Sequence, residues 1–399
     1  MTQSLAYYFD KVEITEPIKE IDEFPEEILP VNTQTDQKEL INAYTSGFFD
    51  GEGCIGAPED KRRNPPTITL ITQLGNTDLS ILTKLKEQYG GEIYIQKKPK
   101  EKEHHKQSWN WDIKDRSTLK KFLTRIFPYS TVKKPQLELG LKFLELTTYT
   151  QGKSTSINEY NLRKKISDKL HELKQTELSE CELNNFNTKI QEMNIDKNQP
   201  SLLDLLDSDK KDIEIIKVET QPEKIQPTYY SKEIINSYVA GFFDGEGCIT
   251  TDEDKRNNPP TINLITILKN TDLPILTKLK QEYGGGISIQ KKPKEKEHHK
   301  QSWHWIISDR TTLKKFLIRI FPYIQYKKPQ IELGLTFIQL KELLNGKSPS
   351  QEQYNIMIKI RDKLHELKQT ELSECELNNF NTQIQEMNID KNQYTMMNY

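Results

Sequence analysis

A tandem duplication constrains this chain more than any other feature. The nine residues Gly-Phe-Phe-Asp-Gly-Glu-Gly-Cys-Ile at 47–55 return unchanged at 241–249, 194 positions later. The offset does not drift, because Lys97 matches Lys291 and His171 matches His365 at the same spacing. The repeat period is that of an ordinary domain, and the chain has 399 residues and 34% hydrophobic content. The sequence therefore predicts two similar halves, each with its own core.

The charges are unevenly distributed along the chain. The overall net charge of -2 gives no sign of a nucleic-acid partner. However, residues 1–37 carry nine acids and two bases, and residues 200–231 carry seven acids and four bases, which leaves both repeats mildly basic. We therefore predict five segments: an acidic N-terminal extension at 1–37, a first repeat at 38–199, an acidic linker at 200–231, a second repeat at 232–394 and a tail at 395–399. A basic face on the repeats leaves phosphate binding open.

Composition also limits the cellular setting. No run of residues approaches the roughly 18 apolar residues of a membrane span, so we expect a soluble protein with no membrane partner. The cysteines are a repeated pair without zinc-type spacing, which predicts reduced thiols: Cys54 and Cys181, Cys248 and Cys375. Only 9 of the 57 basic residues are arginine, while Asn, Ile and Lys are plentiful. This composition indicates an AT-rich genome, such as that of an organelle (chloroplast or mitochondrion) or a low-GC bacterium.

Residue patterns predict the same order of elements in both repeats. In the first, hydrophobic periodicity, β-branched runs, capping residues and glycine breaks place the elements as follows. We expect a helix at 37–50, strands at 53–57 and 67–74, a helix at 79–89, strands at 92–98 and 107–114, and helices at 117–127, 135–149, 158–175 and 179–193. The repeat is thus αββαββα with additional helices at its C-terminal end.

The glycines of the repeated segment stand four residues apart at the end of the first helix. They remove side chains from one helix face, so that a second helix can approach with its backbone nearly in contact. The obvious partner is the copy of the same helix. We expect one stripe to pack against the other: Leu40, Tyr44, Gly47 and Gly51 against Ile234, Tyr238, Gly241 and Gly245.

This packing would place Glu52 beside Glu246. Two neighbouring carboxylates are costly unless a cation or a proton offsets them, and carboxylate oxygens suit Mg²⁺. The sequence therefore predicts a paired metal and phosphate site. The alternative is a glycine-rich turn after a helix, but such a turn has no need of a second glutamate. Asp50 and Asp244 are expected to make hydrogen bonds at the helix ends, because helical geometry turns them away from the glutamates.

The segments 45–53 and 239–247 resemble the LAGLIDADG signature of homing endonucleases. Later landmarks follow in the order of that family: Thr72-Gln73, the cap Asn76-Thr77-Asp78, Gly90-Gly91, and Phe127-Pro128 before Lys133-Lys134. The resemblance covers about 40–150 and 234–344. It implies an α+β fold of two tandem αββαββα repeats, forming a pseudo-twofold saddle of antiparallel sheets on a central two-helix interface. Such a single-chain pseudo-dimer, expected to be a monomer, straddles the major groove of a long pseudo-palindromic DNA site.

The resemblance also implies roles for particular residues. In this family the second acidic residue of the motif binds divalent metal with the preceding carbonyl, which here gives Glu52 with Gly51 and Glu246 with Gly245. Glutamate replaces the usual aspartate. A lysine and a glutamine lie around the cleavage water, and the matching positions are Lys133, Lys327 and Gln73. Because Ile267 replaces the glutamine in the second repeat, we predict unequal cutting of the two strands.

Basic residues at the expected strand ends are candidates for holding DNA phosphates. They are Lys61, Arg62, Arg63, Lys97, Lys98 and Lys100 in the first repeat, and Lys255, Arg256, Lys291, Lys292 and Lys294 in the second.

Two other repeated features, the paired histidines and the tryptophans, have structural explanations. Adjacent histidines on a strand point to opposite faces, so no metal site is expected at 104–105 or 298–299. The tryptophans at 109, 111, 303 and 305 are expected to pack in the cores.

Together these observations predict a site-specific double-stranded DNA endonuclease that hydrolyses phosphodiester bonds with Mg²⁺ or another divalent cation such as Mn²⁺. An intron RNA maturase on the same fold, acting as a splicing cofactor, is one alternative. A DNA-binding regulator without cleavage is another, although a regulator would not require both glutamates. The near-identical halves also predict a target close to a true palindrome.

Overall fold

The computed structural model describes residues 33–62, 66–97, 107–146, 157–175, 231–256, 260–291, 300–344 and 348–369. The chain divides into two compact units, Met1–Lys38 and Glu39–Tyr399, and the second contains both repeats. The predicted helix at 179–193 lies outside the described residues, as do most of the predicted extension, linker and tail. In the part that is described, no helix has both the length and the apolar character needed to cross a membrane.

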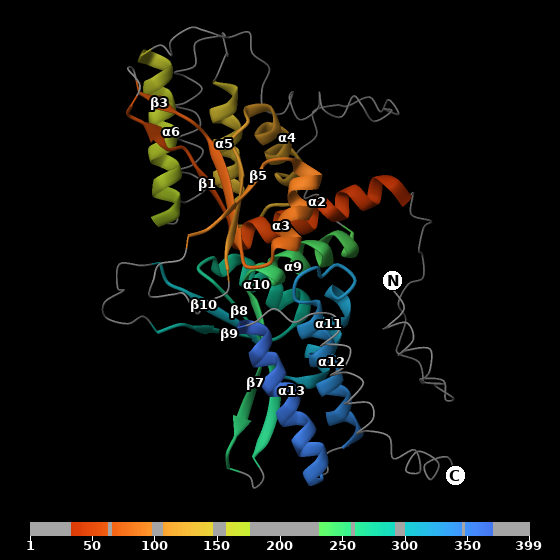
Figure 1. The fold of residues 1–399 in the computed structure, drawn as a ribbon. Helices are drawn as coiled ribbons and strands as arrows, with labels where there is room; N and C mark the ends of the chain where they lie inside the picture. Colours follow the sequence, from red (N-terminus) through yellow and green to blue (C-terminus); the bar gives the residue numbers. More distant parts are fainter. Residues whose placement is uncertain are drawn as a thin grey trace, which may run out of the picture. The chain divides into compact units, whose positions relative to one another are not determined.

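Apart from the first hairpin, the two repeats contain the same elements in the same order (Figure 1). The first consists of α2 (Thr33–Glu52), β1 (Gly53–Gly56), β2 (Glu59–Asp60), β3 (Thr67–Ile68), β4 (Ile71–Asn76), α3 (Leu79–Tyr89), β5 (Glu92–Ile95), β6 (Trp109–Ile113), α4 (Arg116–Ile126), α5 (Lys134–Glu145) and α6 (Ile157–Gln175). The second consists of α9 (Lys232–Glu246), β7 (Gly247–Asp254), β8 (Thr261–Asn270), α10 (Leu273–Tyr283), β9 (Gly286–Ile289), β10 (Trp303–Ile307), α11 (Arg310–Ile320), α12 (Lys328–Leu343) and α13 (Gln351–Gln369). The predicted αββαββα order is confirmed.

Local sequence signals fix the ends of α3. Asp78 caps its N-terminus by accepting hydrogen bonds from the backbone N–H groups of Ser80 and Ile81. Gly90 ends it with a φ of 80°, a left-handed conformation that favours glycine. Asp272 and Gly284, at the same positions of the second repeat, cap and end α10 in the same way. The predicted boundaries of this helix are therefore confirmed in both repeats.

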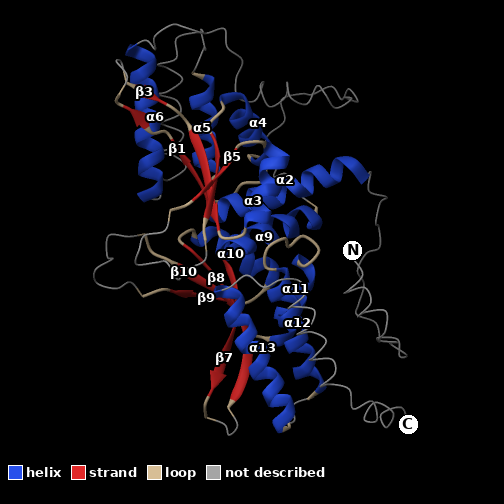
Figure 2. Cartoon of the chain, viewed as in Figure 1, coloured by secondary structure: helices blue, strands red, loops and turns tan. Residues whose placement is uncertain are grey.

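Each repeat has one four-stranded antiparallel sheet, in the orders β1-β4-β6-β5 and β7-β8-β10-β9. The first hairpin differs between the repeats. In the second it is a continuous pair of long strands, β7 and β8 (Figure 2). In the first it is interrupted, and β2 pairs with β3 in a separate small sheet. Pro58 explains the interruption, because its oxygen accepts from the N–H of Thr69 at 3.2 Å but proline has no N–H to return.

The cores are built from aromatic residues in matched positions. In the first repeat Phe122 lies between Phe49, Tyr89 and Trp111, with centroid separations of 5.2 to 5.5 Å and edge-to-face geometry. Trp111 is fully buried, and its indole N–H donates to the carbonyl of Gly90 at 2.8 Å. The second repeat repeats this cluster around Phe316. The prediction that the tryptophans pack in the cores is confirmed. Trp111 and Trp305 are buried, and the half-buried Trp109 and Trp303 pack against the cores.

Helices α6 and α13 follow the segments that carry the sequence motifs. Helix α6 contacts α5 and the edge strand β1, and Ser167 Oγ donates to the carbonyl of Ala57 at 2.7 Å. Its apolar side, including Ile166 and Leu170, is buried. Helix α13 contacts α12 and β7 in the same manner. These helices therefore extend each core along the edge strand of its sheet.

Among the cysteines, Cys54 and Cys248 are free thiols.

Candidate active site at the helix interface

Helices α2 and α9 meet through their glycines, side by side in Figure 1. A Cβ atom built on Gly47 would lie 1.9 Å from the carbonyl oxygen of Tyr238, and one built on Gly241 would lie 1.9 Å from that of Tyr44. No side chain fits at either position. Ser237 Oγ adds a 2.7 Å hydrogen bond to the carbonyl of Leu40. The predicted packing of the glycine stripes against each other is confirmed.

The same seam brings the two glutamates together. A Cβ on Gly51 would lie 3.3 Å from Cγ of Glu246, and a Cβ on Gly245 would lie 3.3 Å from Cγ of Glu52. Burial and then the negative charge of Glu52 raise the pKa of Glu246 to about 7. Burial also raises the pKa of Glu52, and the positive charges of Lys327 and Lys133 oppose this rise. Near neutral pH the pair therefore holds a proton readily, and a cation would relieve the repulsion when the proton leaves.

Asp50 is buried and serves as a hydrogen-bond acceptor, as predicted. It accepts from the backbone N–H groups of Thr131, Val132 and Lys133 at 2.7 to 3.0 Å and from the hydroxyl of Tyr238 at 2.7 Å. Ser130 Oγ donates as well, at 2.7 Å. Asp244 mirrors it, with N–H donors at 325–327 and the hydroxyl of Tyr44. The two aspartates hold the loops that carry the predicted lysines.

The two lysines contact the ends of the motif helices. Lys133 Nζ donates to the carbonyls of Phe49 at 3.0 Å, of Asp50 and of Gly51 at 3.1 Å. Lys327 does the same to the end of α9. Burial lowers the pKa of both lysines. The carbonyls of Gly51 and Gly245, expected as metal ligands, thus accept lysine hydrogen bonds in this structure.

Each glutamate interacts more strongly with the lysine of the other repeat than with the lysine of its own repeat. The attraction that most lowers the pKa of Glu52 comes from Lys327, and the one that most lowers that of Glu246 comes from Lys133. Glu52 and Lys327 also line one cavity of about 390 Å³. The site therefore consists of two centres, each assembled from both repeats.

The cavity contains residues that the sequence did not single out. Its lining includes Asn76, Cys248, Tyr326 and Gln330 beside Glu52 and Lys327. A signal existed for Gln330, because Gln136 and Gln330 each stand three positions after the candidate lysine. Tyr326 carried no such signal, since its counterpart is Val132.

Gln73 lies on β4 directly across from Cys54 of β1, on the face of the sheet that points away from the core. Ile267 occupies the same place across from Cys248. Because Cys248 lines the cavity with Lys327, Ile267 is associated with the Lys327 centre. Gln73 is associated with the Lys133 centre, because Cys54 is among the groups that interact with that ammonium. Gln73 and Ile267 thus occupy equivalent places in the two sheets.

The predicted phosphate contacts are exposed wherever the structure describes them: Lys61, Arg62, Lys97, Lys255, Arg256 and Lys291. The two arginines are already paired, Arg62 with Asp60 and Arg256 with Asp254, in each case through Nε and Nη2. The remaining candidates and the paired histidines lie outside the described residues: Arg63, Lys98, Lys100, Lys292, Lys294, His104, His105, His298 and His299.

The donors at the interface fit a hard divalent cation. The two carboxylates and the carbonyl oxygens of Gly51 and Gly245 supply only oxygen, which Mg²⁺ and Mn²⁺ prefer. Across the described ranges, no cluster of three or more His, Cys, Asp or Glu side chains could hold a metal by side chains alone. A bound ion at the interface would therefore keep water ligands or take backbone oxygens.

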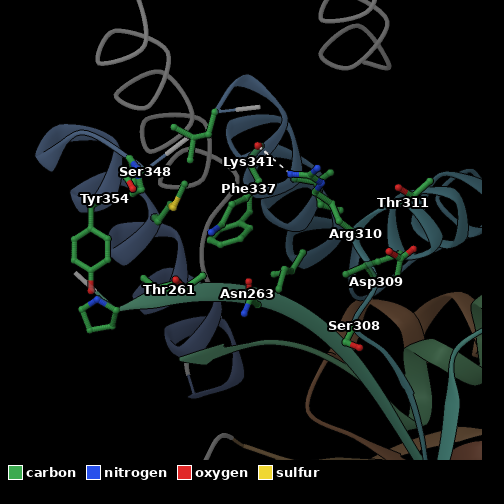
Figure 3. A pocket seen from close by; sticks show the side chains of 18 residues that line it. Thr261, Asn263, Ser308, Asp309, Arg310, Thr311, Phe337, Lys341, Ser348 and Tyr354 are labelled. Atoms are coloured by element: carbon green, nitrogen blue, oxygen red, sulfur yellow. Dashed lines mark hydrogen bonds between the residues drawn. The ribbon is translucent and has the colours of Figure 1, made fainter. Parts of the chain in front are cut away.

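A larger cavity of about 660 Å³ lies elsewhere in the second repeat and includes none of the predicted site residues. Figure 3 shows its side chains coming from β8, the start of α11, α12 and α13. There Arg310 donates to the carbonyl of Lys341 at 3.0 Å.

Comparison with known proteins agrees with this arrangement. Residues 239–343 match the family model described as LAGLIDADG endonuclease. The I-SmaMI LAGLIDADG homing endonuclease bound to cleaved DNA is similar in structure, with a TM-score of 0.53 and 17% identity, covering 80% of this chain and 95% of that one. The meganuclease I-AabMI bound to uncleaved DNA has a TM-score of 0.52 and 18% identity, covering 80% of this chain and 98% of that one.

No curated protein sequence matches the chain. At these identities the structural similarities establish the fold. The match of the second repeat to the family and the shared two-repeat fold confirm the resemblance to single-chain LAGLIDADG homing endonucleases that the motifs indicated.

Proposed function

We propose that this protein, with a LAGLIDADG endonuclease repeat and the fold of the single-chain homing endonucleases, is a site-specific double-stranded DNA endonuclease that depends on a divalent cation. The observation that carries the proposal is the meeting of Glu52 and Glu246 at the glycine seam. A folded interface gains nothing from two adjacent carboxylates, because burial and the repulsion between them raise the pKa of Glu246. Such an arrangement is explained by cation binding.

The residues of each centre have different chemical roles. When bound, a divalent ion supplies an activated water and relief of charge on the phosphate. Glu52 and Glu246 provide its carboxylate ligands. The ammonium groups of Lys133 and Lys327, held at the helix ends, offset negative charge that develops on the scissile phosphates. Gln73 orients water in the Lys133 centre, and Ile267 cannot do so in the other.

Both motif copies lie in one chain, so the interface is complete without a second molecule and we propose that the protein acts as a monomer. The folded repeats, at 38–199 and 232–394, would each contact one half of a pseudo-palindromic site through the basic strand ends. We also propose an origin in an organelle or a low-GC bacterium, on the compositional grounds given above.

The test is cleavage of a plasmid carrying the uninterrupted insertion site of the gene, with Mg²⁺ or Mn²⁺. Wild-type protein should give linear product, and Glu52→Gln and Glu246→Gln should each abolish it. Glu87→Gln, which changes an exposed glutamate on α3, is the matched control and should cut normally. If wild type fails to cut but binds the intron RNA tightly, the maturase alternative replaces this proposal. Full cutting by the double glutamine variant would exclude the assigned site.

A further inference from the structure

The two loops that carry the candidate lysines differ in sequence. We call residues 130–133 and 324–327 the lysine loops; they read Ser-Thr-Val-Lys and Ile-Gln-Tyr-Lys. Asp50 and Asp244 each accept three consecutive backbone N–H groups of their loop, and Asp50 also accepts from Ser130 Oγ at 2.7 Å, which Ile324 cannot reproduce. The loops differ further in the side chains at their outer positions.

The second lysine loop is tied to the first repeat. The hydroxyl of Tyr326 lies 3.2 Å from Oγ1 of Thr77, just before α3. The neighbouring Gln325 accepts a 3.0 Å hydrogen bond from Nζ of Lys84 on α3. These two bonds join residues of different repeats that lie 249 and 241 positions apart in sequence. The loop that carries Lys327 is thus anchored to a helix of the other repeat.

At the corresponding place, the first lysine loop faces a cavity. The counterparts of Gln325 and Lys84 are Thr131 and Lys278, and both line a space of about 490 Å³ between the loop and α10. Val132, the counterpart of Tyr326, has no polar atom with which to reach Thr271, the counterpart of Thr77. On this side the Thr131 side chain interacts with the hydroxyl of Tyr238 of the other repeat, and open space takes the place of the outer anchor.

Tyr326 also covers its neighbouring lysine. The ammonium of Lys327 lies 5.4 Å from the centroid of the Tyr326 ring, within the range of a cation–π interaction. Lys327 is only 9% exposed, whereas Lys133 is half-buried. Valine at position 132 provides no aromatic face. The ring and the anchor together restrict where the Lys327 ammonium can move.

We propose that Tyr326 and Gln325 are positioning residues of the Lys327 centre, and that they offset the loss of the water-orienting glutamine at Ile267. The proposal rests on the proposed endonuclease function. In this view the Lys133 centre depends on Gln73 and tolerates a loosely held loop, whereas the Lys327 centre depends on a fixed one. The two DNA strands are therefore cut by centres that depend on different residues, Gln73 in one and the anchored lysine loop in the other.

Hydrogen exchange tests the anchor without requiring cleavage. In the metal-free protein, the amides at 325–327 should exchange more slowly than those at 131–133. Thr77→Val should remove much of this difference, because it deletes the partner of Tyr326. Thr271→Val is the matched control and should leave both loops unchanged. Equal protection of the two loops in the wild type would overturn the proposal.

Strand-specific cleavage tests whether the anchor affects only the strand that is cut at the Lys327 centre. With each strand labelled separately, Lys327→Met identifies the strand that depends on the Lys327 centre. Tyr326→Phe should slow the cut of that strand about 3- to 10-fold, the effect of one lost hydrogen bond, and leave the other strand within twofold. The double change Thr131→Gln with Val132→Tyr should speed only the other strand. Equal slowing of both strands by Tyr326→Phe would contradict the assignment, whereas no cutting by the wild type would instead reject the proposed endonuclease.

Discussion

The hydroxyl of Tyr238 donates a 2.7 Å hydrogen bond to Oδ2 of Asp50 across the boundary between the repeats. Tyr44 makes the same bond to Asp244 at 2.6 Å. Burial and the adjacent carboxylate raise the pKa of the Tyr238 hydroxyl well above its usual value, so it remains a donor. Because Asp50 also holds the backbone of the first lysine loop, the bond connects the helix interface to the candidate active site.

Tyr238→Phe should lower the free energy of unfolding by about 1.5–3 kcal/mol, the range for a hydrogen bond to a charged group. Chemical denaturation followed by circular dichroism measures it. Tyr160→Phe is the control, because Tyr160 donates to Glu59 near the surface, where water can replace it, so this variant should cost clearly less than Tyr238→Phe. An equal loss of unfolding free energy in the two variants would show that the bond at the helix interface stabilises the protein no more than a surface bond does.

Gly47→Ala should be severely destabilising. The added methyl would lie 1.9 Å from the Tyr238 carbonyl, which is backbone and cannot rotate away, so the two helices must separate. We expect a loss above about 3 kcal/mol, measured by thermal unfolding. Gly286→Ala meets nothing within 4 Å and should change stability by less than about 0.5 kcal/mol. A well-folded Gly47→Ala protein with unchanged melting temperature would contradict the glycine seam.

Stabilisation by Mg²⁺ or Mn²⁺ should increase with pH. The pKa of Glu246 is raised from 4.5 to about 7 in the folded protein, so ionisation disfavours the metal-free fold, and stability from this group is lost as pH rises from about 4.5 through 7. A cation binds the ionised pair and reverses this loss. The metal-induced shift in melting temperature should therefore be larger at pH 8 than at pH 6. Glu246→Gln should remove the pH dependence of that shift, and its persistence in this variant would assign it to another group.

Lys327→Met should reduce stability as well as cleavage. Its ammonium donates to the last carbonyls of α9, and methionine would leave these buried acceptors without a donor. We expect a cost of about 1–3 kcal/mol in chemical denaturation. Lys328→Met changes the adjacent exposed lysine, which lies over the Phe321 ring, and should cost less than about 1 kcal/mol. If Lys327→Met is as stable as Lys328→Met, the lysine has no structural role at the helix end.

The tandem repeat and its glycines are enough to predict the two similar folds and the contact between their first helices. Identical segments 194 residues apart predict two similar folds. Glycines four residues apart predict a close helix contact, because only bare backbone allows it. From these two facts the pairing of Glu52 with Glu246 followed, as did the helix-end role of Asp50. These predictions succeeded because they depend on local spacing and on symmetry, both of which are written in the chain.

Tertiary packing alone decided how the two halves share their centres. The sequence gives no sign that Glu52 interacts most with Lys327 of the other repeat, or that Tyr238 donates to Asp50, because such contacts join residues about 190 to 275 positions apart. The anchor between Tyr326 and Thr77 was equally hidden, since it arises where the duplicated copies differ. Side chains far apart in sequence meet only after both cores have formed, and packing geometry then fixes which of them come into contact.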